Sequence, residues 1–139
     1  MSHYTVMETQ LSSAEHLVKA LNDLGFENVE VHAEPQRLVG WLGDSRTNRA
    51  HVIVRKKEIG FVSNDIGFLQ IPSGYFKAQI SDFDRLKFDE EWLRALTQRY
   101  AYHVAKDLLA EQDFEAVEAA ALQPDVENNE VRLACFNGE

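Results

Sequence analysis

Residues 89–112 read DEEWLRALTQRYAYHVAKDLLAEQ, and their apolar side chains recur at steps of three and four residues. This spacing places them on one face of an α-helix, which predicts a helix that buries that face. Asp89 is the expected N-cap, and the acidic residues after it suit the positive end of the helix dipole. We therefore expect this helix to be the central packing element of the fold. Its apolar stripe consists of Leu93, Leu96, Tyr100, Val104 and Leu108.

A second amphipathic helix is predicted in the stretch SSAEHLVKALNDLGFE, residues 12–27. Ser12 and Glu15 have the spacing of a capping box, in which each side chain satisfies a free backbone N–H of the other residue. Gly25 supplies the left-handed conformation that commonly ends a helix. The apolar stripe of this helix consists of Ala14, Leu17, Val18, Leu21 and Leu24.

Alternating and β-branched residues predict several strands around these helices. Pro35 is expected to end one of them, and Lys56–Lys57 to form the turn of a hairpin. Residues 44–48 are expected to be a loop, and residues 72–88 a long irregular connection because they show no clear period. The predicted β segments are 3–9, 28–34, 37–43, the hairpin 50–63, 66–72, 113–119 and 128–136.

The order of these elements predicts the fold class. The segments GFENVEV at 25–31 and DFEAVEA at 113–119 each follow a predicted helix and share Phe-Glu-x-Val-Glu, by duplication or by chance. Two helices that cover one face of a mainly antiparallel sheet would bury both apolar stripes. The sequence thus predicts a single α+β domain over residues 1–139, similar to a split βαβ arrangement.

The composition is that of an ordinary globular chain, with 45% hydrophobic and 27% charged residues. No apolar run approaches the ~20 residues needed to cross a bilayer, so we expect no membrane insertion. The start MSHYTVMETQ lacks the features of a secretory or transit peptide, and the single cysteine, Cys135, suits a reducing compartment. These features predict a cytoplasmic protein.

Charge is unevenly distributed along the chain. The net charge of −9 argues against nucleic-acid binding, because it repels phosphate backbones at long range. Basic residues nevertheless gather between Arg37 and Lys57, whereas the charged residues from Asp107 onward are mostly acidic. The basic segment is a candidate docking site for another protein with an acidic surface, or alternatively a solvated hairpin edge. The candidate partner-binding residues are Arg46, Arg49, Arg55, Lys56 and Lys57.

Arg99 and His103 lie four residues apart on one flank of the helix that begins near Asp89. With Tyr100, and with His3 where the first strand passes under this helix, they are candidates for lining an anion pocket. The alternative is structural: Tyr100 belongs to the core, and the other two side chains form a solvated flank. No two histidines have the i, i+4 spacing of a helical metal site, and the sequence has no nucleophile triad or phosphate loop. We therefore predict no catalytic group, bound metal or cofactor.

Three stretches identify a resemblance: MSHY at the start, IGFV at 59–62 and LTQRYAYH at 96–103. By these stretches, and over essentially its whole length, the chain resembles the ycf thirty-five-like proteins, an uncharacterised reading-frame family of cyanobacteria and algal chloroplasts. The resemblance implies a small soluble protein of the cytosol or the plastid stroma. It implies no established activity.

The sequence leaves two functions open. The first is a non-enzymatic binding or assembly-accessory protein, which the charge asymmetry favours. The second is a small ligand-binding protein or enzyme whose anion pocket is lined by His3, Arg99, Tyr100 and His103.

Overall fold

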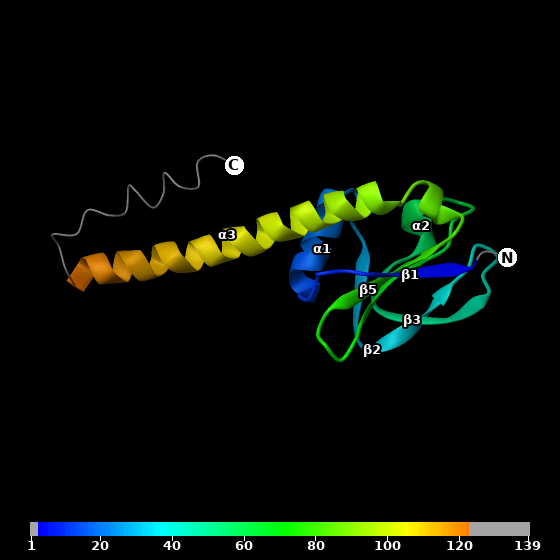
Figure 1. Ribbon diagram of the computed structural model, residues 1–139, viewed down its shortest axis with the longest axis horizontal. Helices are drawn as coiled ribbons and strands as arrows, with labels where there is room; N and C mark the ends of the chain where they lie inside the picture. Colours follow the sequence, from blue (N-terminus) through cyan, green and yellow to red (C-terminus); the bar gives the residue numbers. More distant parts are fainter. Residues whose placement is uncertain (1–2, 123–139) are drawn as a thin grey trace. The chain divides into compact units, whose positions relative to one another are not determined.

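The computed structural model describes the backbone of residues 3–122 and the side chains of residues 3–113. By its internal contacts the chain groups into two units, residues 1–103 and residues 104–139. The first unit contains a five-stranded sheet and the helices that pack on it (Figure 1). The expectation of a single domain over residues 1–139 stays a prediction.

The described elements are five strands, three α-helices and one 3-10 helix. In chain order they are β1 (Tyr4–Glu8), α1 (Ala14–Asp23), β2 (Val29–Val39), β3 (Ser45–Val54), α2 (Lys56–Ile59), β4 (Ile66–Gln70), β5 (Phe76–Ser81), the 3-10 helix η1 (Asp84–Leu86) and α3 (Glu90–Leu122). None of the helices in the described part of the chain combines the length and the apolarity that crossing a bilayer requires.

The sheet has the strand order β1-β5-β4-β3-β2, and each neighbouring pair is antiparallel. Because the direction alternates at every step, β1 and β2 are parallel to each other at the two edges. They are joined through α1, with the other strands inserted between them, which is an expanded split βαβ arrangement. The α+β class predicted from the sequence is confirmed.

The main core lies between the sheet and the helices. Leu17 and Leu21 of α1, Leu96 of α3 and Phe68 of the sheet belong to one buried cluster. Leu93 and Tyr100 pack against it, so the predicted stripe of α3 is core in its first turns, whereas Leu108 is 53% exposed. Figure 1 shows α1 and the start of α3 beside the sheet.

A smaller cluster on the opposite face of β4 bends the β2–β3 hairpin over the sheet. Leu38, Ala50 and Ile53 are buried together there. Gly67 makes this possible, since a Cβ at that position would lie 2.6 Å from the Cβ of Ala50 and 2.8 Å from Cδ2 of Leu38. As a result the end of β2 reaches the start of β4, where the Asp65 N–H donates to the Val39 carbonyl oxygen at 3.0 Å.

The prediction that Pro35 ends a strand is wrong, because β2 continues through it to Val39. The ladder with β3 shifts register between Val31 and Gln36, so Pro35 lies in an irregular part of the pairing. β2 is also an edge strand, where a residue without an N–H is tolerated. The expected loop at 44–48 is likewise mostly strand, since β3 begins at Ser45.

Two further corrections concern the segment between β3 and α3. The chain does not turn back at Lys56–Lys57; the short helix α2 and a loop separate β3 from β4. Residues 72–88 are not an irregular connection, because they include β5, which pairs with both β1 and β4. Buried Gln79 and Ser81 hide the apolar alternation of β5 from sequence inspection.

The helices differ from prediction at their ends. Ser13, not the expected Ser12–Glu15 box, caps α1 by accepting a hydrogen bond from the His16 N–H at 3.3 Å. The cap of α3 is as predicted, since Asp89 accepts from the Trp92 N–H at 3.1 Å. Residues 113–119 are not a strand but continue α3, in keeping with their content of Ala and Glu, both strong helix formers.

The sequence echo between residues 25–31 and 113–119 therefore does not correspond to two similar helix-to-strand units. The strand predicted at 128–136, with Cys135, lies outside the described residues.

Replacing the buried Leu96 with alanine tests whether α3 is the central packing element. Leu96 is fully buried, so Leu96→Ala is expected to lower the free energy of unfolding by about 2–5 kcal/mol in urea titrations. Leu108→Ala on the same helix is the matched control, and its effect is expected within about 0.5 kcal/mol because this side chain is exposed. Equal effects of the two substitutions would mean that the first turns of α3 are not core.

Candidate binding site

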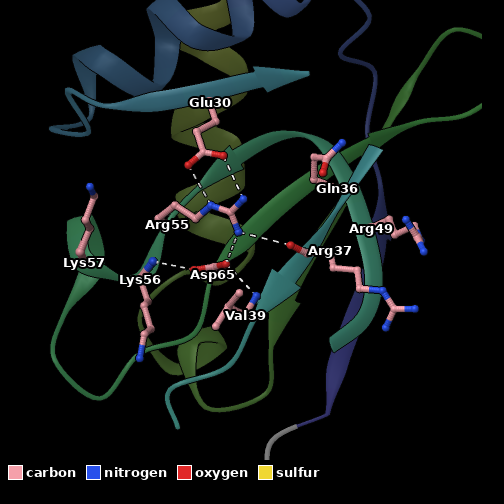
Figure 2. A pocket seen from close by; sticks show the side chains of 9 residues that line it. All are labelled: Glu30, Gln36, Arg37, Val39, Arg49, Arg55, Lys56, Lys57 and Asp65. Atoms are coloured by element: carbon pink, nitrogen blue, oxygen red, sulfur yellow. Dashed lines mark hydrogen bonds and ion pairs between the residues drawn. The ribbon is translucent and has the colours of Figure 1, made fainter. Parts of the chain in front are cut away.

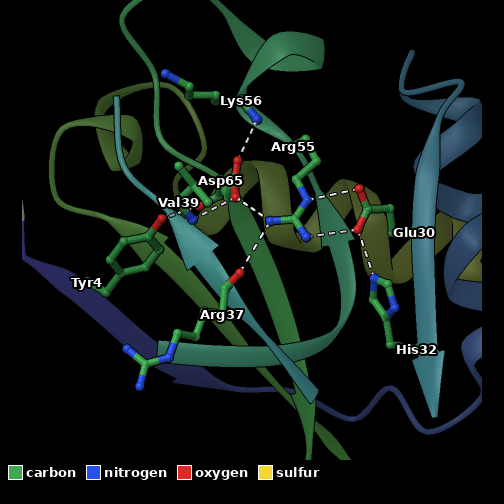
Figure 3. Close-up of polar contacts among 8 residues, drawn as sticks. All are labelled: Tyr4, Glu30, His32, Arg37, Val39, Arg55, Lys56 and Asp65. Atoms are coloured by element: carbon green, nitrogen blue, oxygen red, sulfur yellow. Dashed lines mark hydrogen bonds and ion pairs between the residues drawn. The ribbon is translucent and has the colours of Figure 1, made fainter. Parts of the chain in front are cut away.

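The centre of the candidate site is the Asp65 carboxylate, which immediately precedes β4 and is 1% exposed. Its Oδ1 accepts a hydrogen bond from the Lys56 N–H at 2.7 Å, and its Oδ2 accepts one from the Val39 N–H at 2.7 Å. The Tyr4 hydroxyl donates to the Asp65 backbone carbonyl at 2.5 Å. One residue thereby connects β1, the end of β2 and the start of α2 (Figure 3).

Arg55 joins this carboxylate to a second one. Its Nη1 donates to Asp65 Oδ2 at 2.8 Å, while Nε and Nη2 form a bidentate pair with Glu30, both at 2.9 Å. The same Nη1 also reaches the Arg37 carbonyl oxygen at 3.3 Å. His32 Nε2 contacts Glu30 Oε1, the oxygen that also accepts from Arg55 Nη2, at 2.8 Å. Arg55 is therefore a structural cation with its charge already neutralised, as Figure 3 shows.

These contacts shift the protonation equilibria of the groups involved. Hydrogen bonds from Arg55 lower the pKa of Glu30 to about 2, from an ordinary value of 4.5. Hydrogen bonds from Glu30 and Asp65 raise the pKa of Arg55 further above its usual range. Burial, together with the nearby Asp65 charge, raises the pKa of Tyr4. Glu30 and Arg55 are therefore both charged near neutral pH, whereas the Tyr4 hydroxyl keeps its proton.

A basic concavity of about 670 Å³ opens beside this network (Figure 2). Its cations outnumber its carboxylates five to two. Because Arg55 already engages both carboxylates, the remaining cations give the concavity a positive surplus. The residues of the basic concavity are Glu30, Gln36, Arg37, Val39, Arg49, Arg55, Lys56, Lys57 and Asp65.

Arg37 and Arg49 are directly opposite each other in the β2–β3 ladder. Directly opposed residues point to the same face of a sheet, and like charges in this position repel. Both side chains are exposed, and neither forms an ion pair within the described residues. Figure 2 shows both guanidinium groups directed away from the Arg55 network. The pair is thus available to a negatively charged group from outside.

The five predicted partner-binding residues occupy different environments. Arg49, Lys56 and Lys57 line the basic concavity, whereas Arg55 is held inside the network. Lys56 also donates from Nζ to the Trp41 carbonyl oxygen at 2.8 Å. Arg46 lies elsewhere, paired with Asp44 at 3.2 Å and stacked 5.2 Å from the centre of the Tyr4 ring.

The structure brings together three of the four predicted anion-pocket residues. Arg99 Nε and His103 Nε2 both contact Asp23 Oδ2, at 2.9 Å and 2.7 Å, so a carboxylate of α1 already lies between these two groups. The contact with His103, followed by that with Arg99, lowers the pKa of Asp23. The Tyr100 hydroxyl accepts hydrogen bonds from the Ser12 and Ser13 N–H groups at the start of α1. These contacts fasten α1 to α3.

The fourth residue, His3, is not part of that group. It lies at the start of β1, whereas Ser12, which contacts Tyr100, follows the other end of that strand. His3 lines a separate hollow of about 300 Å³ with Tyr4, Asp44 and Arg46. No group of three possible metal ligands occurs among the described side chains.

Three charged residues of the candidate site, Glu30, Arg37 and Asp65, are not among the residues predicted from the sequence to bind a partner. Glu30 lies in β2 and Asp65 immediately precedes β4, so their joint contact with Arg55 depends on the sheet order. Arg37 belongs to the predicted basic segment, but with a strand end expected at Pro35 the sequence does not define the position of Arg37 relative to Arg49. The cross-strand register supplies that position.

A pH experiment tests the Glu30–Arg55 pair. Because the pKa of Glu30 is lowered in the folded state, its contribution to stability is fully present above about pH 4.5 and is lost as the pH falls toward 2. Glu30→Gln is therefore expected to destabilise the protein at pH 7 and to have a progressively smaller effect below pH 4.5. Urea titrations of both proteins across this range measure the difference. A difference that is equally large at pH 3 would contradict the pairing.

Comparisons with known proteins identify the family to which the chain belongs. The family model "Protein of unknown function (DUF1257)" matches residues 20–129. The chain is also 29% identical over 121 residues to "Uncharacterized protein ycf35" of Cyanophora paradoxa, covering 85% of this chain and 86% of that protein. No solved structure matches the chain significantly. The matched range contains the residues of the basic concavity and the α1–α3 contact between Asp23 and Arg99. The resemblance predicted from the sequence is confirmed, and the chain belongs to the DUF1257 family.

Proposed function

We propose that the protein is a non-enzymatic binding module that docks an acidic protein surface on its basic concavity. The observation that carries this proposal is the directly opposed pair of Arg37 and Arg49. Two like charges in this arrangement reduce the stability of the sheet, and no carboxylate among the described residues compensates them. An external anionic surface would relieve the repulsion when it binds.

The arrangement suits docking because the surrounding cations lie on different kinds of element. Arg37 and Arg49 are fixed on paired strands next to a rigid, neutralised Arg55, while the exposed Lys57 lies on the short helix α2. Arginine side chains on a rigid surface bind carboxylates in a defined geometry, and nearby lysines add charge without strict geometry. A positive patch on an otherwise negative protein also orients the approach of an acidic partner.

The anion pocket of a small ligand-binding protein or enzyme, lined by His3, Arg99, Tyr100 and His103, has less support. Asp23 already supplies a carboxylate to Arg99 and His103. An external anion would have to displace it.

The setting we propose is the cytoplasm of a cyanobacterium or the stroma of a plastid. The similarity to a protein of Cyanophora paradoxa supports such a setting.

Charge reversal tests the docking proposal with a defined probe. A fluorescent peptide of glutamate and aspartate is titrated into the full chain, and anisotropy reports binding. Wild-type protein is expected to bind the peptide at 50 mM salt and to lose most of the affinity at 1 M, where the Debye length falls to about 3 Å. Arg37→Glu combined with Arg49→Glu is expected to abolish binding without lowering the melting temperature, because both side chains are exposed and unpaired in the described chain.

Arg94→Glu combined with Lys106→Glu is the control, since it changes the net charge equally at exposed positions of α3, a helix that contributes no residue to the lining of the concavity. The proposal fails if both double variants lose the same affinity, which would indicate a net-charge effect alone. It also fails if a DNA duplex of equal charge binds the wild type more tightly than the peptide does.

A further inference from the structure

An aromatic cleft adjoins the basic concavity. It has a volume of about 480 Å³ and is lined by Trp41, Lys56, Lys57, Gly60 and Phe61. Phe61 is 98% exposed and Trp41 is 44% exposed, and the neighbouring Leu42 and Val62 are also exposed. Exposed apolar side chains gathered in one place commonly mark a binding surface, and aromatic residues dominate the binding energy of such surfaces.

The two loops that form the aromatic cleft are held in place by polar contacts. The Trp41 N–H donates to Asn64 Oδ1 at 2.9 Å, and the Trp41 carbonyl accepts from Lys56 Nζ. Asn64 is itself buried, and its N–H donates to Asp84 Oδ2 at 2.9 Å. That carboxylate also accepts from the Ser81 hydroxyl at 2.8 Å. The wall that carries Trp41 is therefore preorganised, so a partner meets little ordering cost there.

The lysines beside the aromatic cleft determine which residues should flank an apolar side chain that binds there. Lys56 and Lys57 line both the aromatic cleft and the basic concavity, which makes the two surfaces continuous. An apolar side chain in the aromatic cleft would therefore have cations beside it, and its own chain would continue across Arg37 and Arg49. A segment that combines one large apolar residue with flanking carboxylates matches both surfaces.

We infer that the aromatic cleft receives an aromatic or large aliphatic side chain from an acidic segment of the docked partner. The inference rests on the proposed docking function and specifies the partner: a short acidic segment with one apolar anchor. The anchor packs between Trp41 and Phe61, and the carboxylates on either side bind Lys57 and the arginine pair. The apolar anchor slows dissociation, whereas the charges accelerate association.

Two short acidic peptides, identical except for a central Phe or Ser, test the inference by NMR titration of the isotope-labelled full chain. The Phe peptide is expected to bind about tenfold more tightly, in proportion to the apolar area it buries, and to shift the Trp41 indole N–H signal. Phe61→Ser is expected to reduce its affinity to that of the Ser peptide. This substitution removes a side chain that is almost fully exposed, so folding is unaffected. Leu86→Ser, at an 84% exposed position of η1, is the matched control and is expected to change nothing.

The outcomes separate this inference from the docking proposal. If both peptides bind equally, and only the Arg37 and Arg49 reversals weaken them, docking stands and the apolar anchor is wrong. If neither peptide binds the wild type better than the reversed protein, the docking proposal itself fails.

Other results contradict the chemistry assigned to the partner. Equal binding of an uncharged peptide with the same central Phe would mean that the carboxylates are irrelevant. Tighter binding of an oligothymidine strand or of anionic lipid vesicles would assign the aromatic cleft to a different class of ligand. Shifts at Trp41 and Phe61 that grow with protein concentration alone would mean that a second copy of the chain occupies it.

Discussion

The structure around the candidate site depends on one buried carboxylate. Asp65 is almost inaccessible to water, and its two oxygens accept hydrogen bonds from Lys56 N–H, Val39 N–H and the Arg55 guanidinium. A buried carboxylate without partners would be strongly unfavourable, so Asp65 can be buried only if these donors surround it. Meeting that requirement brings the end of β2, the end of β3 and the start of β4 to one point. This contact, together with the cluster of Leu38, Ala50 and Ile53, holds the end of the β2–β3 hairpin beside β4, where the basic concavity lies.

The network divides the basic residues into two groups with different roles. Arg55 satisfies the buried carboxylate and carries no free charge, because it also forms the bidentate pair with Glu30. Arg37 and Arg49 flank it on the outer side without carboxylate partners in the described residues. In the sequence, Arg37, Arg49 and Arg55 are all members of one basic segment and cannot be told apart. In the fold, Arg55 has a structural role, and Arg37 and Arg49 are available for binding. Arg46, paired with Asp44, belongs to neither group.

Elements with a clean period were predictable from the sequence, and the rest depended on partners far away in the chain. The amphipathic stripes of α1 and of the first turns of α3 indicated both helices, and alternation indicated β1 and the first part of β2. β5 was not predicted, because two of its buried side chains, Gln79 and Ser81, are polar. Hydrogen bonds to β3 and to Asn64 satisfy them, and no local sequence pattern reveals these partners. Pro35 was misleading because its effect depends on whether a strand is at an edge. Only the basic segment of the site was predictable, because the contacts of Glu30 and Asp65 with Arg55 exist only when the strands are arranged in the order of this sheet.

The central claim is that the Asp65 carboxylate determines the geometry of the site, and Asp65→Asn tests it most directly. An asparagine must place its NH2 group either toward the Lys56 N–H or toward both the Val39 N–H and Arg55 Nη1, so at least one donor loses its acceptor. In urea titrations at pH 7 we expect a loss of about 3–5 kcal/mol, the range for breaking a buried charge pair. Hydrogen exchange of the Val39 and Lys56 amides should accelerate in parallel. A loss below about 0.5 kcal/mol, typical of surface substitutions, with unchanged amide protection would contradict the claim.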